Sequence, residues 1–420
     1  MKSRKAIALF LAGAMAAAAL TACGGGSNDG QTTASGGGEE TQAEASGGTL
    51  VVDFWTAPQQ VQYDFWEGKA EAFNATGTQV NGQTVEVHVQ QMPESPSSEA
   101  GIQNAIATGT APAVSENINR GFAATLAASD VVYDLSAEDW FNDVIEARQM
   151  GDTMESWAID GKQYVLPVYV NPMSWQWNMK ALEVFGYDEA PTTIAELQDI
   201  MSQWNDKADE LAAIGVTHSF YRPSLQRPDQ YWDRWYDFMM PYDAISQGKS
   251  IVDGTTLTMD KDAAVKAMEV LGLFGNTIQQ GELSSIWIED QPSVLVTINA
   301  PWEISLYRES NKVYGEDYVY GPALVENEGD TPYCFADSKG LTFYKTDNIS
   351  EDEHQGAVEF VKWVYNAENS AQTDLEWLNA TTMLPVRGDL NENETFASVM
   401  EEYPELSALA QWVPYSMPGL

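Results

Sequence analysis

Apolar and polar residues follow one another along the first half of the chain in patterns that predict alternating strands and helices. Residues 49–55 form an apolar run typical of a buried strand, and a helical stretch with three aromatic residues follows. Residues 84–90 then alternate strictly between valine and polar residues, which is the period of a half-exposed strand. A second helix is expected over 98–108, ending at Gly109. This order predicts an α/β domain with a parallel sheet.

The same kind of pattern returns after residue 160. Strands are predicted at 164–169 and 174–178, and a capping box at 193–196 opens a helix after Pro191. Residues 357–364 place apolar side chains at the i, i+3, i+4, i+7 spacing of an amphipathic helix. The fold class that follows is α/β with two lobes, each a mostly parallel sheet flanked by helices.

The first residues predict export from the cell. A short basic start leads into an apolar stretch over 6–20, which suits a signal peptide and is too short to span a membrane. The stretch ends in Leu-Thr-Ala-Cys, which resembles a bacterial lipobox; the alternative is an ordinary signal peptide with a chance cysteine. We expect residues 1–22 to be a lipoprotein signal peptide, Cys23 to carry the lipid (including palmitate), and 23–48 to form a flexible Gly/Ser-rich tether.

The charge and the cysteines limit the partners. The chain has 62 acidic and 21 basic residues, a net charge of −41, which argues against nucleic acid and anionic membrane surfaces. We therefore expect membrane contact through the lipid only, on the outer face of the bacterial cytoplasmic membrane. With Cys23 lipidated, Cys334 is left alone, so no disulfide framework is expected. Cys334 is either a reactive thiol or a small buried hydrophobe.

Signatures of catalysis are scarce. The chain has no nucleophile elbow, no phosphate-binding loop and no metalloprotease motif, and its three histidines are scattered. Carboxylates are so abundant that a pair at glycosidase spacing would carry little information. We expect no enzyme activity, no cofactor and no metal site.

Aromatic residues placed in polar, non-periodic segments are the more informative feature. They follow the first strand at Trp55 and lie in segments 174–178, 231–236 and 299–303. A sugar ring has an apolar face that a Trp or Tyr ring can cover, and a rim of hydroxyl groups that Asn, Gln, Asp or Arg can satisfy. The clusters therefore favour a carbohydrate-binding cleft, although each aromatic taken singly is also compatible with a core position.

Several segments resemble, in order, motifs of the family 1 extracellular solute-binding proteins of ABC importers, with the maltose-binding type as the nearest pattern. The turn at 108–112 resembles the family's G-x-x-P-D turn, except that Ala113 stands where Asp is usual. Many members also continue into another helix beyond the position of Leu420. The matching segments are 161–167 (GKQYVLP), 177–180 (WNMK), 191–197 (PTTIAEL), 298–303 (INAPWE), 359–363 (EFVKW) and 384–387 (LPVR).

The resemblance implies a periplasmic-binding-protein-like fold with the ligand cleft between the lobes. The chain would cross between them near 167–169 and near 331–335. Lobe 1 would then hold 49–167 plus about 333–380, and lobe 2 would hold 168–332 plus about 381–420.

The resemblance also places site residues. Trp302 corresponds to a sugar-stacking aromatic, and Tyr231 lies near a second one. Asn119 and Arg120 stand where the maltose-binding type has an Asp-Arg pair, and Asn171 stands where it has a Glu, so two carboxylates are replaced. The polar and aromatic clusters add further candidates for ligand binding: Trp55, Trp175, Trp232 and Glu303.

The predicted function is capture of a sugar, most simply an oligosaccharide, by cleft closure, followed by delivery to the permease of an ABC importer. We expect a monomer. Two alternatives stay open. The first is a binding protein for a polyol phosphate or a peptide; the close spacing of Arg222, Arg227 and Arg234 in the sequence supports phosphate binding. The second is a surface glycoside hydrolase.

Overall fold

The apolar and alternating segments near the start of the chain pair as predicted, with β1 (Thr49–Thr56) parallel to β3 (Gln83–Gln91) in a computed structural model of the protein. Within β3, Val85 and Val87 are buried while the intervening Glu86 is exposed. The structure describes residues 47–93, 95–223, 232–253, 256–281, 287 and 289–419, without the side chains at 152, 222, 223, 232–234, 279–281, 302 and 305.

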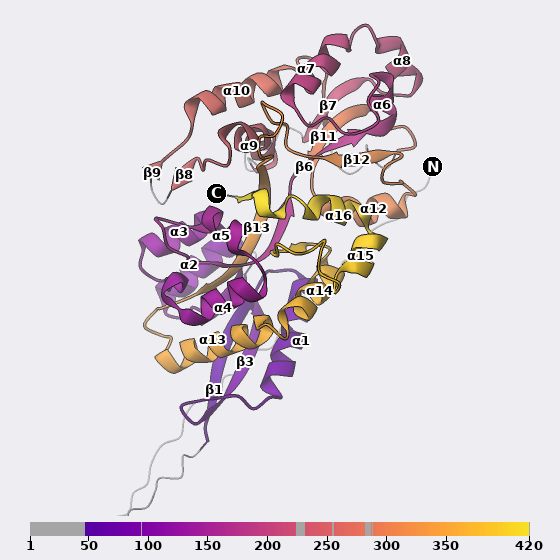
Figure 1. The fold of residues 1–420 in the computed structure, drawn as a ribbon. Coiled ribbons are helices and arrows are strands. Elements are labelled where there is room, and N and C mark those ends of the chain that lie inside the picture. Colours follow the sequence, from indigo (N-terminus) through magenta and orange to yellow (C-terminus); the bar gives the residue numbers. More distant parts are fainter. Residues whose placement is uncertain are drawn as a thin grey trace, which may run out of the picture. The chain divides into compact units, whose positions relative to one another are not determined.

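The larger sheet has eight strands among the described residues, in the order β14-β5-β13-β4-β1-β3-β2, with β15 paired to β13. Strands β1, β3 and β4 are parallel, whereas β13 runs antiparallel to both β4 and β5. Helices α1 (Gln60–Asn74) and α13 (Glu351–Tyr365) pack against β3 and β1 (Figure 1). The other strands are β2 (Gln79–Val80), β4 (Val114–Ile118), β5 (Leu166–Pro172), β13 (Cys334–Phe343), β14 (Leu384–Pro385) and β15 (Ser416–Pro418).

The helices of this part begin and end where the sequence signals stand. Helix α2 (Ser98–Thr108) ends at Gly109, whose φ of 67° is the left-handed conformation that glycine adopts most easily. In α13 the residues at the predicted spacing are fully buried, and a capping box at Ser350 and Glu353 starts the helix. The remaining helices are α3 (Arg120–Ala128), η1 (Leu135–Ala137), α4 (Asp139–Ala147), α5 (Gly151–Trp157) and α14 (Ser370–Thr381).

The second sheet has five strands among the described residues, in the order β10-β7-β11-β6-β12. Strand β7 is parallel to β10 and β11, but β6 is antiparallel to β11 and β12, so this sheet is mixed. Strand β6 is buried at every position because it lies inside the sheet with both faces covered. The strands are β6 (Ser174–Asn178), β7 (His218–Pro223), β10 (Ile278–Gly281), β11 (Val294–Asn299) and β12 (Tyr318–Gly321).

Helices and one hairpin accompany the second sheet. The predicted capping box at Thr193 and Glu196 is present at the start of α7. Helix α16 contacts β12 and η2, and Figure 1 shows it beside α12. The elements are α6 (Met179–Val184), α7 (Ile194–Gln203), α8 (Ala208–Ala213), α9 (Trp232–Ser246), the hairpin β8 (Val252–Asp253) and β9 (Thr256–Leu257), α10 (Lys261–Gly272), η2 (Pro301–Glu303), α12 (Ile304–Glu309), α15 (Ala397–Glu402), α16 (Pro404–Ala410) and η3 (Val413–Tyr415).

Extended segments lie side by side where the chain passes from one sheet to the other. Strand β5 stays in the first sheet as far as Pro172, and β6 begins in the second sheet two residues later. Ala336 of β13 is paired with Pro172 on one side and with Pro418 of β15 on the other. The predicted crossing lies near 167–169. Pairing of β5 with β13 and β14 instead keeps residues 168–172 in the first sheet, so the chain leaves this sheet a few residues later than predicted. How the lobes divide stays a prediction.

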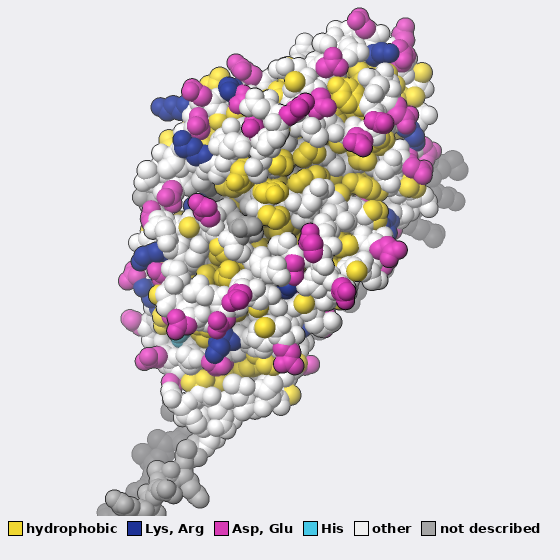
Figure 2. Space-filling view, viewed as in Figure 1, with side chains coloured by type: hydrophobic (Ala, Val, Ile, Leu, Met, Phe, Trp, Pro, Cys, Tyr) yellow, Lys and Arg dark blue, Asp and Glu magenta, His cyan; other side chains and the backbone are white. Residues whose placement is uncertain are grey.

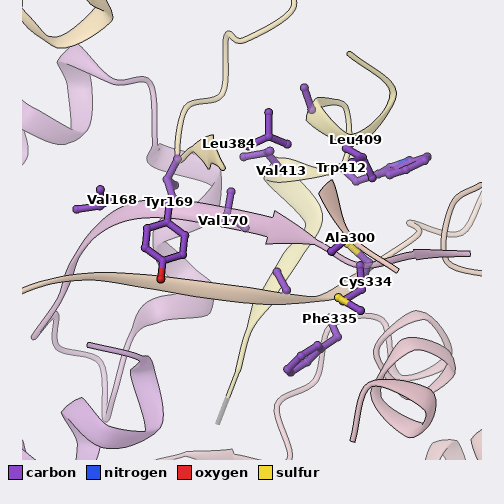
Figure 3. Close-up of a cluster of buried hydrophobic side chains, with 14 of the residues drawn as sticks. Val168, Tyr169, Val170, Ala300, Cys334, Phe335, Leu384, Leu409, Trp412 and Val413 are labelled. Carbon is purple, nitrogen blue, oxygen red and sulfur yellow. The ribbon is translucent and has the colours of Figure 1, made fainter. Parts of the chain in front are cut away.

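An apolar cluster is buried around this crossing (Figure 3). Cys334 belongs to it, and burial raises the pKa of its thiol to about 12. Burial of the side chain and the raised pKa of the thiol favour a small buried residue over a reactive thiol at Cys334. The other labelled members of the cluster are Val168, Tyr169, Val170, Ala300, Phe335, Leu384, Leu409, Trp412 and Val413.

Candidate functional site

A pocket of about 510 Å³ opens where segments connected to the two sheets meet near the crossing. One side of the pocket comes from the start of α3, the end of α5 and the residues that follow α5. The other side comes from the stretch between α9 and α10. The crossing segments before β13 and at β15 complete the lining. The lining residues are Arg120, Glu155, Ser156, Ala158, Gly161, Gln247, Gly248, Lys249, Ser250, Asp253, Thr258, Tyr333, Pro414, Ser416 and Met417.

Arg120 is the predicted binding residue that this pocket contains. It begins α3 and is only 6% exposed. Its Nε and Nη2 donate to the Ala158 carbonyl at 3.1 and 2.6 Å, and Nη1 donates to the Val252 carbonyl at 3.3 Å. The carboxylate of Asp253 lies 3.6 Å from Nη2. Most donors of this guanidinium are therefore already occupied by groups of the protein.

The pocket holds opposite charges and one aromatic wall. Lys249 faces the carboxylate of Asp260 at 3.5 Å, and Glu155 supplies a further acidic group to the lining. The ring of Tyr333 lies close to Gly248, where an added Cβ would come within 2.9 Å of it, so only glycine fits there. An aromatic face beside hydroxyl, amide and carboxylate groups can hold an uncharged polar ring.

Three other candidates lie on strands of the first sheet or directly after one. Trp55 is half-buried at the end of β1. Asn119 caps α3, because its Oδ1 accepts a hydrogen bond from the Phe122 amide at 2.7 Å. Asn171, on β5, is 2% exposed, and its Oδ1 meets no hydrogen-bond donor within the part of the chain that the structure describes.

Glu303 belongs to a buried polar network at the end of β11. The amide of Asn299 donates to Gln176 Oε1 at 2.8 Å and to Glu303 Oε2 at 3.0 Å. The Tyr307 hydroxyl donates to the same two oxygens. Burial, with the nearby Glu303 carboxylate, raises the pKa of Tyr307 well above its ordinary value, so the hydroxyl keeps its proton. The network fixes the side chain of Glu303, which is half-buried.

Trp175 requires a correction. The sequence placed it among the ligand-binding residues, but it is fully buried in β6. Its ring lies 6.2 Å from Trp177, 5.9 Å from Phe220 and 6.2 Å from Phe274. Strand β6 is covered on both faces, so Trp175 is a core residue.

Other predicted residues fall outside what the structure describes. Tyr231 and Cys23 are among the residues left undescribed, and only the backbones of Trp232 and Trp302 are described, in α9 and η2. Their roles stay predictions. Conversely, sequence reasoning missed Asp253 and Lys249, which come from a connection between helices without any motif. Tyr333 lies within the segment that the sequence predicted as a crossing, which was the available signal.

Comparison with protein families decides the class. The model of the family described as bacterial extracellular solute-binding protein matches residues 69–408. The chain belongs to this family. Its members are the capture proteins of ABC importers, and the family and its neighbours are binding proteins rather than enzymes. No curated protein matches this solute-binding protein in a sequence search.

Solved structures agree with this assignment and confirm the two-lobed periplasmic-binding-protein fold. An uncharacterized protein from Listeria monocytogenes EGD-e is 34% identical, with a TM-score of 0.77 over 88% of this chain and 89% of that one. The cyclic α-maltosyl-1,6-maltose binding protein of Arthrobacter globiformis is 15% identical, with a TM-score of 0.65 over 88% of both chains. UgpB from Mycobacterium tuberculosis, solved with glycerophosphocholine, is 14% identical, with a TM-score of 0.61 over 88% and 87%. The last two show the fold alone.

Two searches of the described residues bear on partners. None of the helices described is long and apolar enough to cross a membrane. Within the same residues, no group of three or more His, Cys, Asp or Glu side chains could hold a metal ion.

Proposed function

We propose that this solute-binding protein captures a carbohydrate outside the cell and delivers it to the permease of an ABC importer, while a lipid on Cys23 holds it to the membrane. The observation that carries the proposal is the pocket around Arg120, to which segments connected to both sheets contribute. A pocket of this origin can change shape when two lobes approach each other, which is how such clefts capture a ligand.

The lining favours an uncharged ligand with many hydroxyl groups. Ser156, Gln247 and Thr258 can exchange hydrogen bonds with hydroxyls, and the ring of Tyr333 lines the pocket as an apolar surface on which a sugar can pack. Glu155 adds a carboxylate, which accepts hydrogen bonds strongly from hydroxyl donors. Affinity would come from stacking, and specificity from polar groups that must be satisfied on closure.

A phosphate-bearing solute is the second candidate, since a structural neighbour was solved with glycerophosphocholine. Against it, the donors of Arg120 are largely spent on backbone carbonyls, and Glu155 and Asp253 line the same pocket. Among the described residues of the lining, an anion would meet these two carboxylates and find Lys249 as the one further cation; the side chains of Arg222, Arg227 and Arg234 lie outside what the structure describes. The charge of the pocket therefore supports a neutral sugar.

A ligand panel tests the proposal. Melting of the purified protein is followed with mono- and oligosaccharides, a polyol phosphate and a short peptide, each at rising concentration. A sugar at about 100 times its Kd should stabilise the fold by about 2.7 kcal/mol. Stabilisation by the polyol phosphate or the peptide, with none by any sugar, would overturn the choice of ligand. Prolonged incubation with the bound oligosaccharide should release no reducing ends; their release would identify a hydrolase.

A further inference from the structure

One group of hydrogen bonds joins the two sides of the pocket directly. Arg120 starts α3 behind β4 of the first sheet, while its partners Val252 and Asp253 form β8. Strand β8 lies in the connection between α9 and α10; α9 contacts β7 of the second sheet as well as β13 at the crossing. The guanidinium is thus shared between the Ala158 carbonyl on its own side and the hairpin on the other side.

The carboxylate of Asp253 also accepts a hydrogen bond from the first side. The backbone amide of Asp160 donates to its Oδ1 at 3.2 Å, and the Arg120 Nη2 lies 3.6 Å from the same oxygen. Arg120 is buried, whereas the Asp253 side chain is 48% exposed, so the contact lies at the rim of the pocket. A carboxylate that accepts a hydrogen bond from a backbone amide and faces a buried guanidinium at 3.6 Å is a stronger link than an isolated surface ion pair.

We propose that Arg120, Asp160 and Asp253 form a latch that holds the pocket closed, so that Asp253 raises affinity through closure in addition to any contact that it makes with the ligand at the rim. A ligand binds the closed form, and the apparent Kd rises as the fraction of closed molecules falls. Neutralising Asp253 removes the charge that faces Arg120 and leaves the pocket lining otherwise unchanged. The latch goes beyond the proposed function, because it acts on closure whatever solute is bound.

The variant Asp253→Asn tests the latch first without any ligand. Exposed Val61 on α1 and Val265 on α10 are replaced by cysteine and carry a donor–acceptor dye pair. Cys23→Ser removes the thiol proposed to carry the lipid, and Cys334 is buried away from the dye. The distance between the dyes, measured by energy transfer, should be longer in Asp253→Asn than in the wild type. In Asp253→Glu, which keeps the carboxylate, it should return towards the wild-type value. Asp347→Asn, at an exposed aspartate, should leave the distribution unchanged.

Ligand titration supplies the second measurement. With a sugar identified in the panel, Asp253→Asn should weaken the Kd about tenfold, because the closed fraction falls by that factor. Added salt should weaken binding by the wild type and change the variant less. Unchanged energy transfer in Asp253→Asn overturns the latch. A shifted distribution in a protein that binds no sugar would support the latch while rejecting the carbohydrate.

Discussion

A buried group of charged side chains fixes the start of β5, and removal of its central carboxylate should destabilise the fold. Arg148 is 0% exposed and donates to both oxygens of Asp374, at 3.0 and 2.9 Å. It also donates to the carbonyl groups of the second and third residues of β5. Arg387 reaches the same carboxylate at 3.2 Å and has a second partner in Asp389.

The size of the effect follows from what Asp374→Asn leaves behind. The amide has nearly the same shape, but Arg148 loses its counter-charge while it stays buried, and breaking a buried pair in this way costs about 3–5 kcal/mol. The ring of Tyr365, 4.3 Å from the guanidinium carbon, offsets only part of this loss. Arg387 keeps Asp389, so we place the cost near the lower end. The melting temperature should fall by roughly 4–8 °C.

Urea unfolding of the ligand-free protein, followed by tryptophan emission, measures the change. Glu376→Gln on the same helix is the matched control, because Glu376 pairs with Lys69 at 2.5 Å but is 46% exposed, and such a pair contributes less than about 1 kcal/mol. If Asp374→Asn were as stable as this control, the assignment of a structural role to the buried charges would be wrong.

Three further predictions concern pH, anchoring and the ligand. Burial raises the pKa of Glu116 from 4.5 to about 7. The protonated Glu116 therefore stabilises the fold fully below about pH 4.5, and this stabilisation is lost as the pH rises through 7. In denaturant titrations, the free energy of unfolding of Glu116→Gln should rise by about 3 kcal/mol relative to that of the wild type between pH 4.5 and 8. A difference between the two proteins that does not change with pH would contradict this. Cys23→Ala should move the protein from the membrane fraction to the medium, and its retention would reject the lipid anchor. Trp302→Ala should weaken sugar binding about 30- to 1,000-fold with unchanged ligand-free melting; a much lower melting point with normal binding would make Trp302 a core residue.

Local patterns carried much of the fold. The predicted strand 174–178 and helix 98–108 agree with β6 and α2 to the residue, because side-chain periodicity and a terminal glycine act within a few positions. Trp175 shows where this reasoning stops. Its neighbour Gln176 suggested an exposed segment, yet that amide oxygen is satisfied inside the sheet by Asn299 and Tyr307, more than a hundred residues away.

The candidate site was predicted less well for the same reason. Arg120 was identified through a family motif, but its bond to Val252 spans 132 positions, and nothing near either residue signals the contact. Asp253 is one of many acidic residues, which Figure 2 shows scattered over the visible face rather than gathered in one patch. Where charge is so common, only the folded arrangement can tell which carboxylate matters.

The pairing of Ala336 with Pro172 and Pro418 has a mechanical consequence. Extended segments tied edge to edge behave as a ribbon: it bends readily across its width, while sliding of one segment past another would break the hydrogen bonds between them. A rotation of one sheet relative to the other would therefore bend this ribbon, at the end of the first sheet, rather than slide its segments past one another. If the lobes close on a solute as proposed, this guidance would bring them to the same final geometry for each solute, and the transporter would meet one shape of the loaded protein.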